Sequence, residues 1–190
     1  MVTNVMIVGV GGQGSLLASK LLGQVVLKKG FDVKVSEVHG MSQRGGSVVT
    51  YVRWGDKVSS PIIDKGEADY IISFELLEAA RYIGYLKKGG RVIVNSQRLD
   101  PMPVLTGNAQ YPEGLDDKMK ASGANVDMMD ALGLAMQAGS AKSANIALMG
   151  RFSTYYQDIS EEDWLSALAD CVKPQFLEMN KKAFALGRNK

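Results

Sequence analysis

Short apolar runs alternate along the chain with longer segments whose apolar residues recur at helical spacing. Residues 4–10 are apolar and rich in β-branched side chains, a pattern typical of a buried strand. Residues 15–29 carry a wide apolar stripe at helical spacing, and Gly30 is suited to end that helix. The alternating residues 32–38 and the Val-, Thr- and aromatic-rich residues 47–54 predict two further strands.

The same alternation continues in the middle of the chain. Its predicted elements are a strand at residues 70–74, a helix at 75–86 ended by Gly89-Gly90, a strand at 91–95, a helix near 115–122 and a short strand at 124–128. Residues 97–114 contain three prolines and are expected to form an irregular crossover. Because strands and helices alternate, the pattern favours a parallel sheet covered by helices.

From residue 129 onward the pattern is mostly helical. Ser160 precedes three acidic residues, which is typical of a capped helix start. Pro174 is suited to the first turn of a terminal helix that ends near Gly187. We therefore predict an α/β, Rossmann-like three-layer fold with a mostly parallel sheet, covering helices and a helical C-terminal part. At roughly 100–200 residues per domain, residues 1–190 are expected to form one domain.

Composition excludes several classes of protein. The chain has 22 Lys and Arg against 20 Asp and Glu, so it lacks the clustered basic excess of a nucleic-acid binder. Its single cysteine, Cys171, rules out an internal disulfide, and an iron–sulfur cluster takes four thiolates. No metal-ligand spacing is visible. No apolar run approaches the ~20 residues of a membrane span, and no signal peptide is apparent, so we expect a cytoplasmic protein.

A glycine-rich turn joins the first predicted strand to the first predicted helix. The segment Gly9-Val10-Gly11-Gly12-Gln13-Gly14 fits the pattern G-x-G-x-x-G, in which glycines let the backbone approach a pyrophosphate. We expect backbone N–H groups of Gly11 to Gly14 to bind an anion, with Gly11 at a positive φ. Glu37 lies where such folds place a ribose-binding acid. The alternative is a turn that only packs a strand closely against a helix.

The loop around residues 39–46 concentrates reactive side chains. His39 is the only histidine and a candidate general acid or base, or else a locally hydrogen-bonded side chain. Arg44, flanked by glycines, is a candidate clamp for a carboxylate or phosphate, or else an exposed or interface arginine. We expect this loop to face a partner subunit near the catalytic centre. Lys142 and Asn145 are weaker candidates, in a small-residue stretch that permits close approach of backbone or a partner, and we favour helix packing for them. Cys171 is assigned to the core.

The two motifs together carry a family resemblance. The run G-V-G-G-Q-G, followed by a small-residue helix, a strand and R-G-G, resembles the gamma-type subunit or domain of the 2-oxoacid:ferredoxin oxidoreductases, the pyruvate/ketoisovalerate oxidoreductase group. The variant S-E-V-H-G-M-S-Q-R-G-G, which leads into S-V-V-T-Y-V-R, is similar to the small beta subunit of the indolepyruvate branch. The resemblance covers essentially the whole chain.

The resemblance implies a division of labour between subunits. The family oxidatively decarboxylates a 2-oxoacid to an acyl-CoA and reduces ferredoxin. A larger partner subunit is expected to carry the thiamine diphosphate and the iron–sulfur clusters. This chain is then expected to hold neither, to be inactive alone, and to have coenzyme A as its candidate ligand. The cofactor-binding residues implied are Gly9, Gly11, Gly12, Gln13, Gly14, Arg44, Gly45 and Gly46.

Two other functions remain open from the residues alone. One is a free-standing NAD- or FAD-dependent oxidoreductase, based on the glycine motif and Glu37, although 190 residues leave little room for a substrate domain. The other is a nucleotide-binding or scaffold module without a catalytic role.

Overall fold

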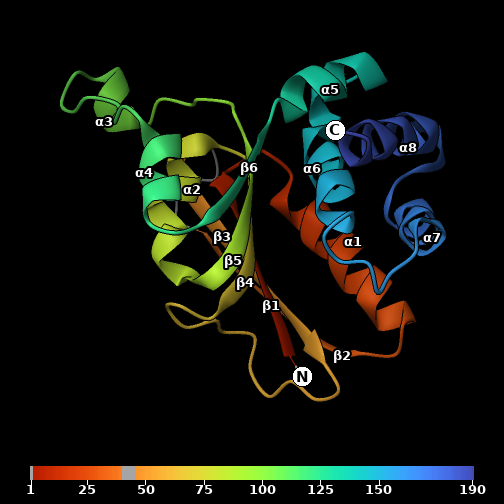
Figure 1. Ribbon diagram of the computed structural model, residues 1–190. Coiled ribbons are helices and arrows are strands. Elements are labelled where there is room, and N and C mark those ends of the chain that lie inside the picture. Colours follow the sequence, from red (N-terminus) through yellow and green to blue (C-terminus); the bar gives the residue numbers. More distant parts are fainter. Residues whose placement is uncertain (1, 40–45) are drawn as a thin grey trace.

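The structure is a computed structural model that describes residues 2–39 and 46–190 of the chain. Its six-stranded sheet has the order β2-β3-β1-β4-β5-β6 (Figure 1). The strands are β1 (Val2–Val10), β2 (Asp32–His39), β3 (Ser47–Gly55), β4 (Ala68–Ser73), β5 (Leu86–Asn95) and β6 (Asn125–Met129). Strand β1 is parallel to β4, β4 to β5 and β5 to β6, whereas β3 runs antiparallel to both β1 and β2. The prediction of a mostly parallel sheet is therefore confirmed.

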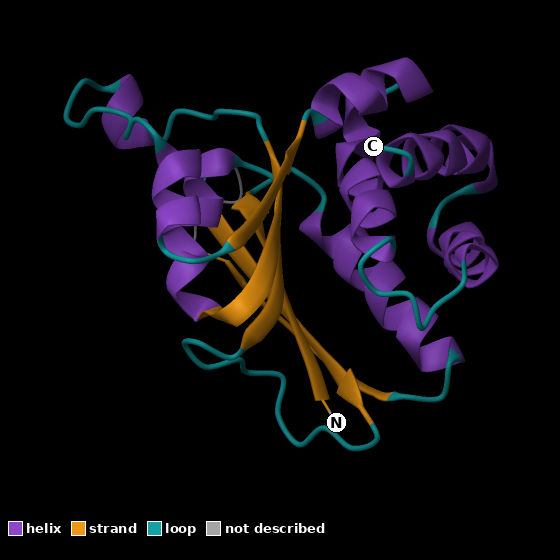
Figure 2. Ribbon diagram, in the orientation of Figure 1, coloured by secondary structure: helices purple, strands orange, loops and turns teal. Residues whose placement is uncertain are grey.

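Helices cover both faces of the sheet, which gives the predicted three layers (Figure 2). Helices α2 (Leu76–Tyr82) and α4 (Leu115–Ala121) pack on one face, with the short α3 (Met102–Leu105) beyond them. The other face carries α1 (Ser15–Lys28), α5 (Ala131–Ala138), α6 (Ala144–Ser153), α7 (Glu161–Cys171) and α8 (Pro174–Arg188). Two 3₁₀ turns complete the described elements, η1 (Ile83–Tyr85) and η2 (Ala141–Ser143). No helix in residues 2–39 and 46–190 is long and apolar enough to cross a membrane.

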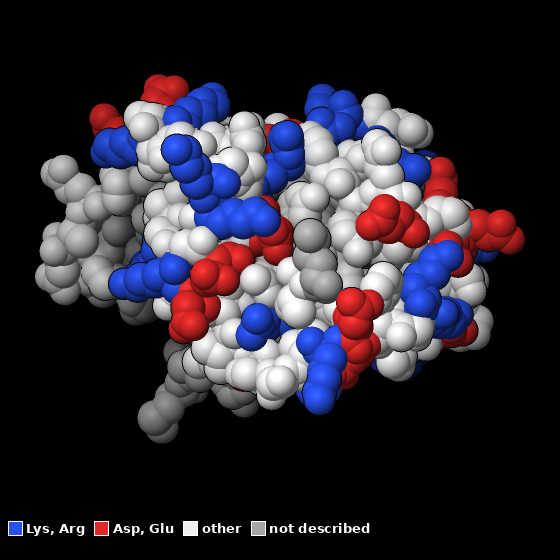
Figure 3. Space-filling model, turned by 60° about the horizontal axis from the view of Figure 1, so that its bottom comes forward, with Lys and Arg blue, Asp and Glu red and all other residues white. Residues whose placement is uncertain are grey.

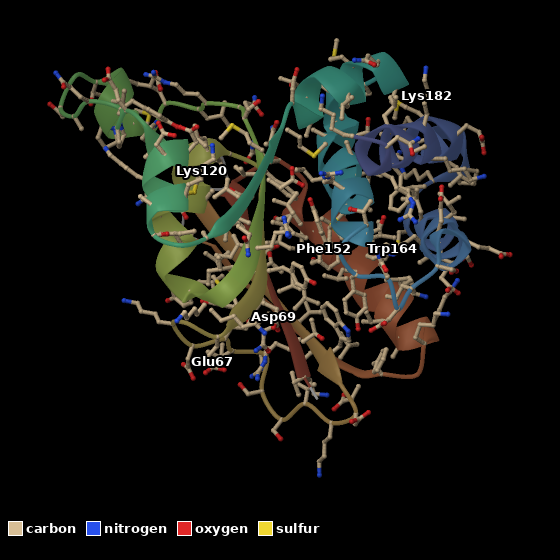
Figure 4. The ribbon with its side chains drawn as sticks, viewed as in Figure 1. Glu67, Asp69, Lys120, Phe152, Trp164 and Lys182 are labelled. Atoms are coloured by element: carbon tan, nitrogen blue, oxygen red, sulfur yellow. The ribbon has the colours of Figure 1, made fainter. Side chains whose placement is uncertain are left out.

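Strand β1 is apolar on both faces because it lies inside the sheet with helices on either side. Val5 and Ile7 join the core under α1 and α6, whereas Met6 and Val8 join the core under α2. The larger core is closed by aromatic side chains. Phe152 and Trp164 meet edge to face with ring centroids 6.0 Å apart (Figure 4).

Helices α6 and α8 approach so closely that their backbones touch. A Cβ atom on Gly187 would lie 1.9 Å from the carbonyl oxygen of Ala147, and one on Gly150 would lie 2.1 Å from that of Phe184. Glycine is therefore required at both positions for want of space. The packing role assigned to the small-residue stretch is correct for this part of α6.

Most local predictions agree with the structure, with one clear correction. Ser160 and Asp163 form a capping box at the start of α7, and Pro174 occupies the first turn of α8. The predicted helix at 75–86 instead ends at Tyr82, and Gly89-Gly90 lie inside β5. The pairing of β5 with β4 is irregular between Leu86 and Arg91, and Gly89, with a φ of 80°, lies in that irregular part of β5.

Candidate functional site

A crevice of about 440 Å³ opens at the carboxyl ends of β1, β4 and β5. Helix α1 leaves β1 toward one face of the sheet, and α2 leaves β4 toward the other. Such a divergence leaves a gap at the end of the strands, where open α/β sheets commonly bind ligands. The crevice is lined by the glycine turn at residues 12–14 and by Phe74, Asn95, Gln97, Lys142 and Asn145, among others.

The turn itself depends on glycine at two positions. Gly12 has a φ of 97°, and Gly14, the N-cap of α1, has a φ of 87°. A Cβ atom on Gly14 would also lie 2.5 Å from Nδ2 of Asn145, which donates a hydrogen bond of 3.0 Å to the Gly14 carbonyl. The positive φ that we expected at Gly11 falls on these two residues instead. Helix α6 thus contacts the turn directly through Asn145.

Part of the predicted binding motif is committed to holding the turn. Oε1 of Gln13 accepts from the Val10 N–H at 2.7 Å, and Nε2 donates to the Phe74 carbonyl at 3.1 Å. A Cβ atom on Gly9 would lie 2.8 Å from that Oε1 atom, so Gly9 makes room for the Gln13 side chain. The geometry makes Gln13 a clamp between the ends of β1 and β4.

The backbone N–H groups of the turn lie at the positive, N-terminal end of α1. The Gly11 N–H donates to the Gly46 carbonyl at 2.9 Å, and the Gln13 N–H donates to Val10. Among the described residues, the N–H groups of Gly12, Gly14 and the first two residues of α1 have no acceptor. The first turn of α1 also contains no acidic residue. The helix dipole is therefore unopposed at its N-terminus, which favours an anion there.

Lys142 adds a full positive charge to the crevice. It lies on η2, is exposed, and has no carboxylate within ion-pair distance in the part of the chain that the structure describes. Asn95 is by contrast occupied, because it donates to Phe74 and accepts from the Ala131 N–H at 3.1 Å. Sequence reasoning assigned Lys142 and Asn145 to helix packing. The sequence feature that could have indicated a binding site is the run of small residues around them, because such residues let a ligand or a backbone come close.

A second cavity of about 420 Å³ lies on the other side of the same helix terminus. It is lined by Gly12, Gly14 and Glu37, among others. The Glu37 carboxylate accepts from the hydroxyl of Ser15 at 3.2 Å and from that of Thr50 at 3.1 Å. Moreover, β3 separates β2 from β1, so Glu37 does not lie on the strand beside the glycine turn. The structure thus uses Glu37 to tie β2 to α1 and β3.

A buried carboxylate supports the outer wall of the crevice. Glu75, only 1% exposed, caps α2 through the Glu78 N–H at 2.9 Å. Its other oxygen accepts from the Leu99 N–H at 3.1 Å and from the Tyr111 hydroxyl at 2.9 Å. Burial raises the pKa of Tyr111, and the hydrogen bond to Glu75 raises it further. Glu75 therefore fastens the crossover segment to α2, a role that its place in a predicted helix did not indicate.

The structure describes only some of the site residues predicted in the loop at residues 39–46. Gly46 lies beside Gly11, so the R-G-G segment ends next to the glycine turn and the two motifs of the resemblance meet. The backbone of His39 ends β2. Arg44 and Gly45 lie outside the described residues, and so does the predicted contact of this loop with a partner subunit.

The electrostatic character of the crevice differs from that of the opposite end of the molecule. Figure 3 brings forward the end where β1 begins, and basic and acidic side chains are interspersed there. Within the described residues, no group of three or more His, Cys, Asp or Glu side chains is arranged to hold a metal ion.

Comparison with known proteins gives consistent matches over the whole chain. The family model described as pyruvate ferredoxin/flavodoxin oxidoreductase matches residues 4–190. The chain is 45% identical to indolepyruvate oxidoreductase subunit IorB of Thermococcus kodakarensis, over 97% of this chain and 93% of that one. It is 44% identical to the protein of the same name from Pyrococcus horikoshii, with the same coverage. The common gamma subunit of the pyruvate/ketoisovalerate oxidoreductases of T. kodakarensis is 26% identical over 96% of this chain and 93% of that one.

Solved structures share the fold. The gamma subunit of a keto/oxoacid ferredoxin oxidoreductase from Geobacter sulfurreducens has a TM-score of 0.73 at 22% identity, over 98% of this chain and 96% of that one. A 2-oxoglutarate:ferredoxin oxidoreductase from Magnetococcus marinus, with 2-oxoglutarate, coenzyme A and succinyl-CoA bound, has a TM-score of 0.74 at 18% identity. That match covers 99% of this chain but 30% of the other, so the fold also occurs as one part of a longer chain.

Proposed function

Because the chain belongs to the pyruvate ferredoxin/flavodoxin oxidoreductase family, we propose that it works as the small subunit of an indolepyruvate:ferredoxin oxidoreductase. The observation that carries this proposal is the 45% and 44% identity, over nearly the full length of both chains, to two indolepyruvate oxidoreductase subunits. The predicted resemblance to this family is confirmed. The same matches do not support a free-standing NAD- or FAD-dependent enzyme.

In the proposed complex, the partner subunit carries thiamine diphosphate and the iron–sulfur clusters. The reaction oxidatively decarboxylates an aryl pyruvate, forms an acyl-CoA and reduces ferredoxin. The single cysteine of this chain supports that division, because a cluster takes four thiolates. The chain's own contribution is then to bind and position a reactant that meets the partner's cofactors.

The crevice is suited to an anionic group of such a reactant. It combines unbonded N–H groups at the start of α1 with the uncompensated charge of Lys142. Phosphates of coenzyme A and the carboxylate of a 2-oxoacid both match this chemistry. We assign coenzyme A to the crevice as the reactant of the small subunit. The proposal keeps Arg44, Gly45 and Gly46 as further binding residues and His39 as a candidate acid or base.

Co-expression with the larger subunit tests the proposal as a whole. The purified pair is expected to reduce ferredoxin only when indolepyruvate and coenzyme A are both present, and each subunit alone is expected to be inactive. A small subunit that neither associates with the larger one nor affects its turnover would contradict the proposal.

Thermal stability in the presence of ligands tests the binding assignment. A ligand at about 100 times its dissociation constant should raise the free energy of unfolding by about 2.7 kcal/mol. We expect coenzyme A to stabilise the chain and NAD and FAD to have no effect. Lys142→Met should lower the affinity for coenzyme A at least tenfold. The control is Lys182→Met, since Lys182 is exposed on α8 and does not line the crevice (Figure 4). Equal affinity of the two variants would contradict the assignment of Lys142.

A further inference from the structure

A third cavity, of about 590 Å³, lies behind the crevice between α1, the turn before η2, and the junction of α7 and α8. Its apolar lining consists of Leu17, Cys171, Val172, Phe176 and Met179. The side chain of Phe176 is 45% exposed, so the fold leaves an aromatic ring at the mouth of an apolar hollow. Exposed apolar surface of this kind is typical of an interaction site.

The mouth of this cavity is positively charged. Lys142 and Lys173 line it and are exposed, and Lys20 lies close enough to Cys171 for its charge to lower the pKa of that thiol. None of these three lysines has a carboxylate partner within the described ranges.

Other lysines nearby are paired. Lys28 binds Asp170 at 2.5 Å, and Lys29 binds Asp163 at 2.6 Å. Two ion pairs thus join α1 to α7, whereas the lysines around the cavity lack such partners among the described residues. We call this cavity, which is lined by Lys142 and Lys173 with Lys20 nearby, the lysine-rimmed pocket.

We propose that the lysine-rimmed pocket receives a segment of the partner subunit that inserts one bulky apolar side chain and flanks it with carboxylates. This inference rests on the proposed function, because it needs a partner subunit. The apolar lining favours an aromatic or aliphatic side chain of the partner, and such buried side chains usually lie at the centre of a protein interface. The lysines select the acidic flanks and disfavour basic ones, since charges within the Debye length of about 8 Å at physiological salt act on one another.

The position of the pocket gives this contact a functional consequence. The pocket shares Leu17 and Lys142 with the crevice, so the two cavities lie on either side of these side chains. A partner segment seated in the pocket therefore abuts the proposed binding site for coenzyme A. The interface and the reactant site thus share one side chain from α1 and one from η2.

Cys171 provides a reporter inside the pocket. It is the only cysteine of the chain and is half-buried, and burial raises the pKa of its thiol. A small alkylating reagent followed by mass analysis of this chain therefore reads the occupancy of the pocket directly. We expect the alkylation rate of Cys171 to fall at least tenfold when the purified partner subunit is added.

The binding experiment compares variants of the full chain for association with the partner subunit at low and high salt. Phe176→Asp should weaken association at least tenfold, and Ile62→Asp is its matched control, because Ile62 is 48% exposed and lies far along the chain between β3 and β4. An acid at position 176 lies in the first turn of α8, where it does not weaken the helix.

The charge requirement is tested at the rim. Lys173→Glu should weaken association about fivefold or more at low salt and much less at 0.5 M salt, where the Debye length is only about 4–5 Å. Lys173→Arg keeps the charge and should associate like the unchanged chain.

Each outcome bears on a different claim. If the unchanged chain fails to associate, the proposed function fails, and the docking proposal fails with it. If it associates and Phe176→Asp associates equally well, the docking proposal alone is overturned. If the affinity for the partner subunit changes neither with salt nor with Lys173→Glu, the docked segment is not acidic. The chain could instead form concentration-dependent dimers that Phe176→Asp abolishes while partner binding is unchanged. A second copy of the chain would then occupy the pocket, and the proposal would be overturned.

Discussion

The two cavities that flank the N-terminus of α1 share the glycine turn but not its electrostatics. Gly12 and Gly14 line both. On one side the positive helix end meets Lys142, which has no carboxylate partner among the described residues. On the other side it meets Glu37, whose carboxylate is held by two hydroxyl groups of the chain itself. A glycine-rich turn therefore does not determine a ligand, because the side chains around it decide which side accepts an anion.

The largest effect is expected where both cavities depend on one residue. Gly14→Ala should lower the free energy of unfolding by about 2–4 kcal/mol, since a left-handed φ costs about 1–2 kcal/mol for an alanine and the new Cβ also displaces Asn145. Gly12→Ala carries the same kind of φ but meets open space, so it should lose only about 1–2 kcal/mol. Urea denaturation of both variants measures the difference. Equal losses would show that Asn145 does not confine the turn.

The next effect concerns the Glu37 side. Glu37→Ala should destabilise the chain by about 1–3 kcal/mol, because it leaves the buried Thr50 hydroxyl and the Ser15 hydroxyl without their acceptor. Glu37→Gln keeps an acceptor oxygen and should lose less than about 1 kcal/mol. Chemical denaturation compares the two. If both variants are as stable as the unchanged chain, Glu37 does not tie β2 to its neighbours.

The smallest effect separates the two sides by ligand affinity. Glu37→Gln removes a negative charge near the helix terminus and should raise the affinity for coenzyme A by about twofold to threefold, or ~0.5 kcal/mol. Lys142→Met acts in the opposite direction and should leave stability unchanged, since Lys142 is exposed. Titration calorimetry measures both affinities. An unchanged affinity in Glu37→Gln would mean that its two hydroxyl partners already neutralise its influence on the crevice.

Local signals in the sequence predicted the parts of this molecule that depend on local chemistry. The capping serine at 160, the proline at 174 and the glycine turn at 9–14 are all found where their residue types indicated. The boundary at Gly89-Gly90 was wrong, because glycine marks both helix ends and irregular strands, and only the pairing with β4 separates the two.

The pairing of distant strands and the burial of individual side chains could not be predicted from the sequence. No pattern along the chain indicated that β3 inserts between β1 and β2, yet this pairing removes Glu37 from the strand beside the glycine turn. Lys142 was assigned to packing because its stretch is rich in small residues, and the close backbone contacts with α8 are found at Ala147 and Gly150, further along the chain. Glu75 was predicted only as the first residue of a helix, and its partners Leu99 and Tyr111 come from a segment without regular pattern.

The close contact of α8 with α6 has a practical consequence for anyone who handles this protein. Gly187 rests on the backbone of α6 at Ala147, and two residues earlier Asn145 holds the glycine turn. Removing the last turn of α8 would therefore disturb the glycine turn that lines the crevice. A tag placed before residue 2 is attached at the far end of the sheet, where β1 begins (Figure 1), and leaves that mechanical link intact.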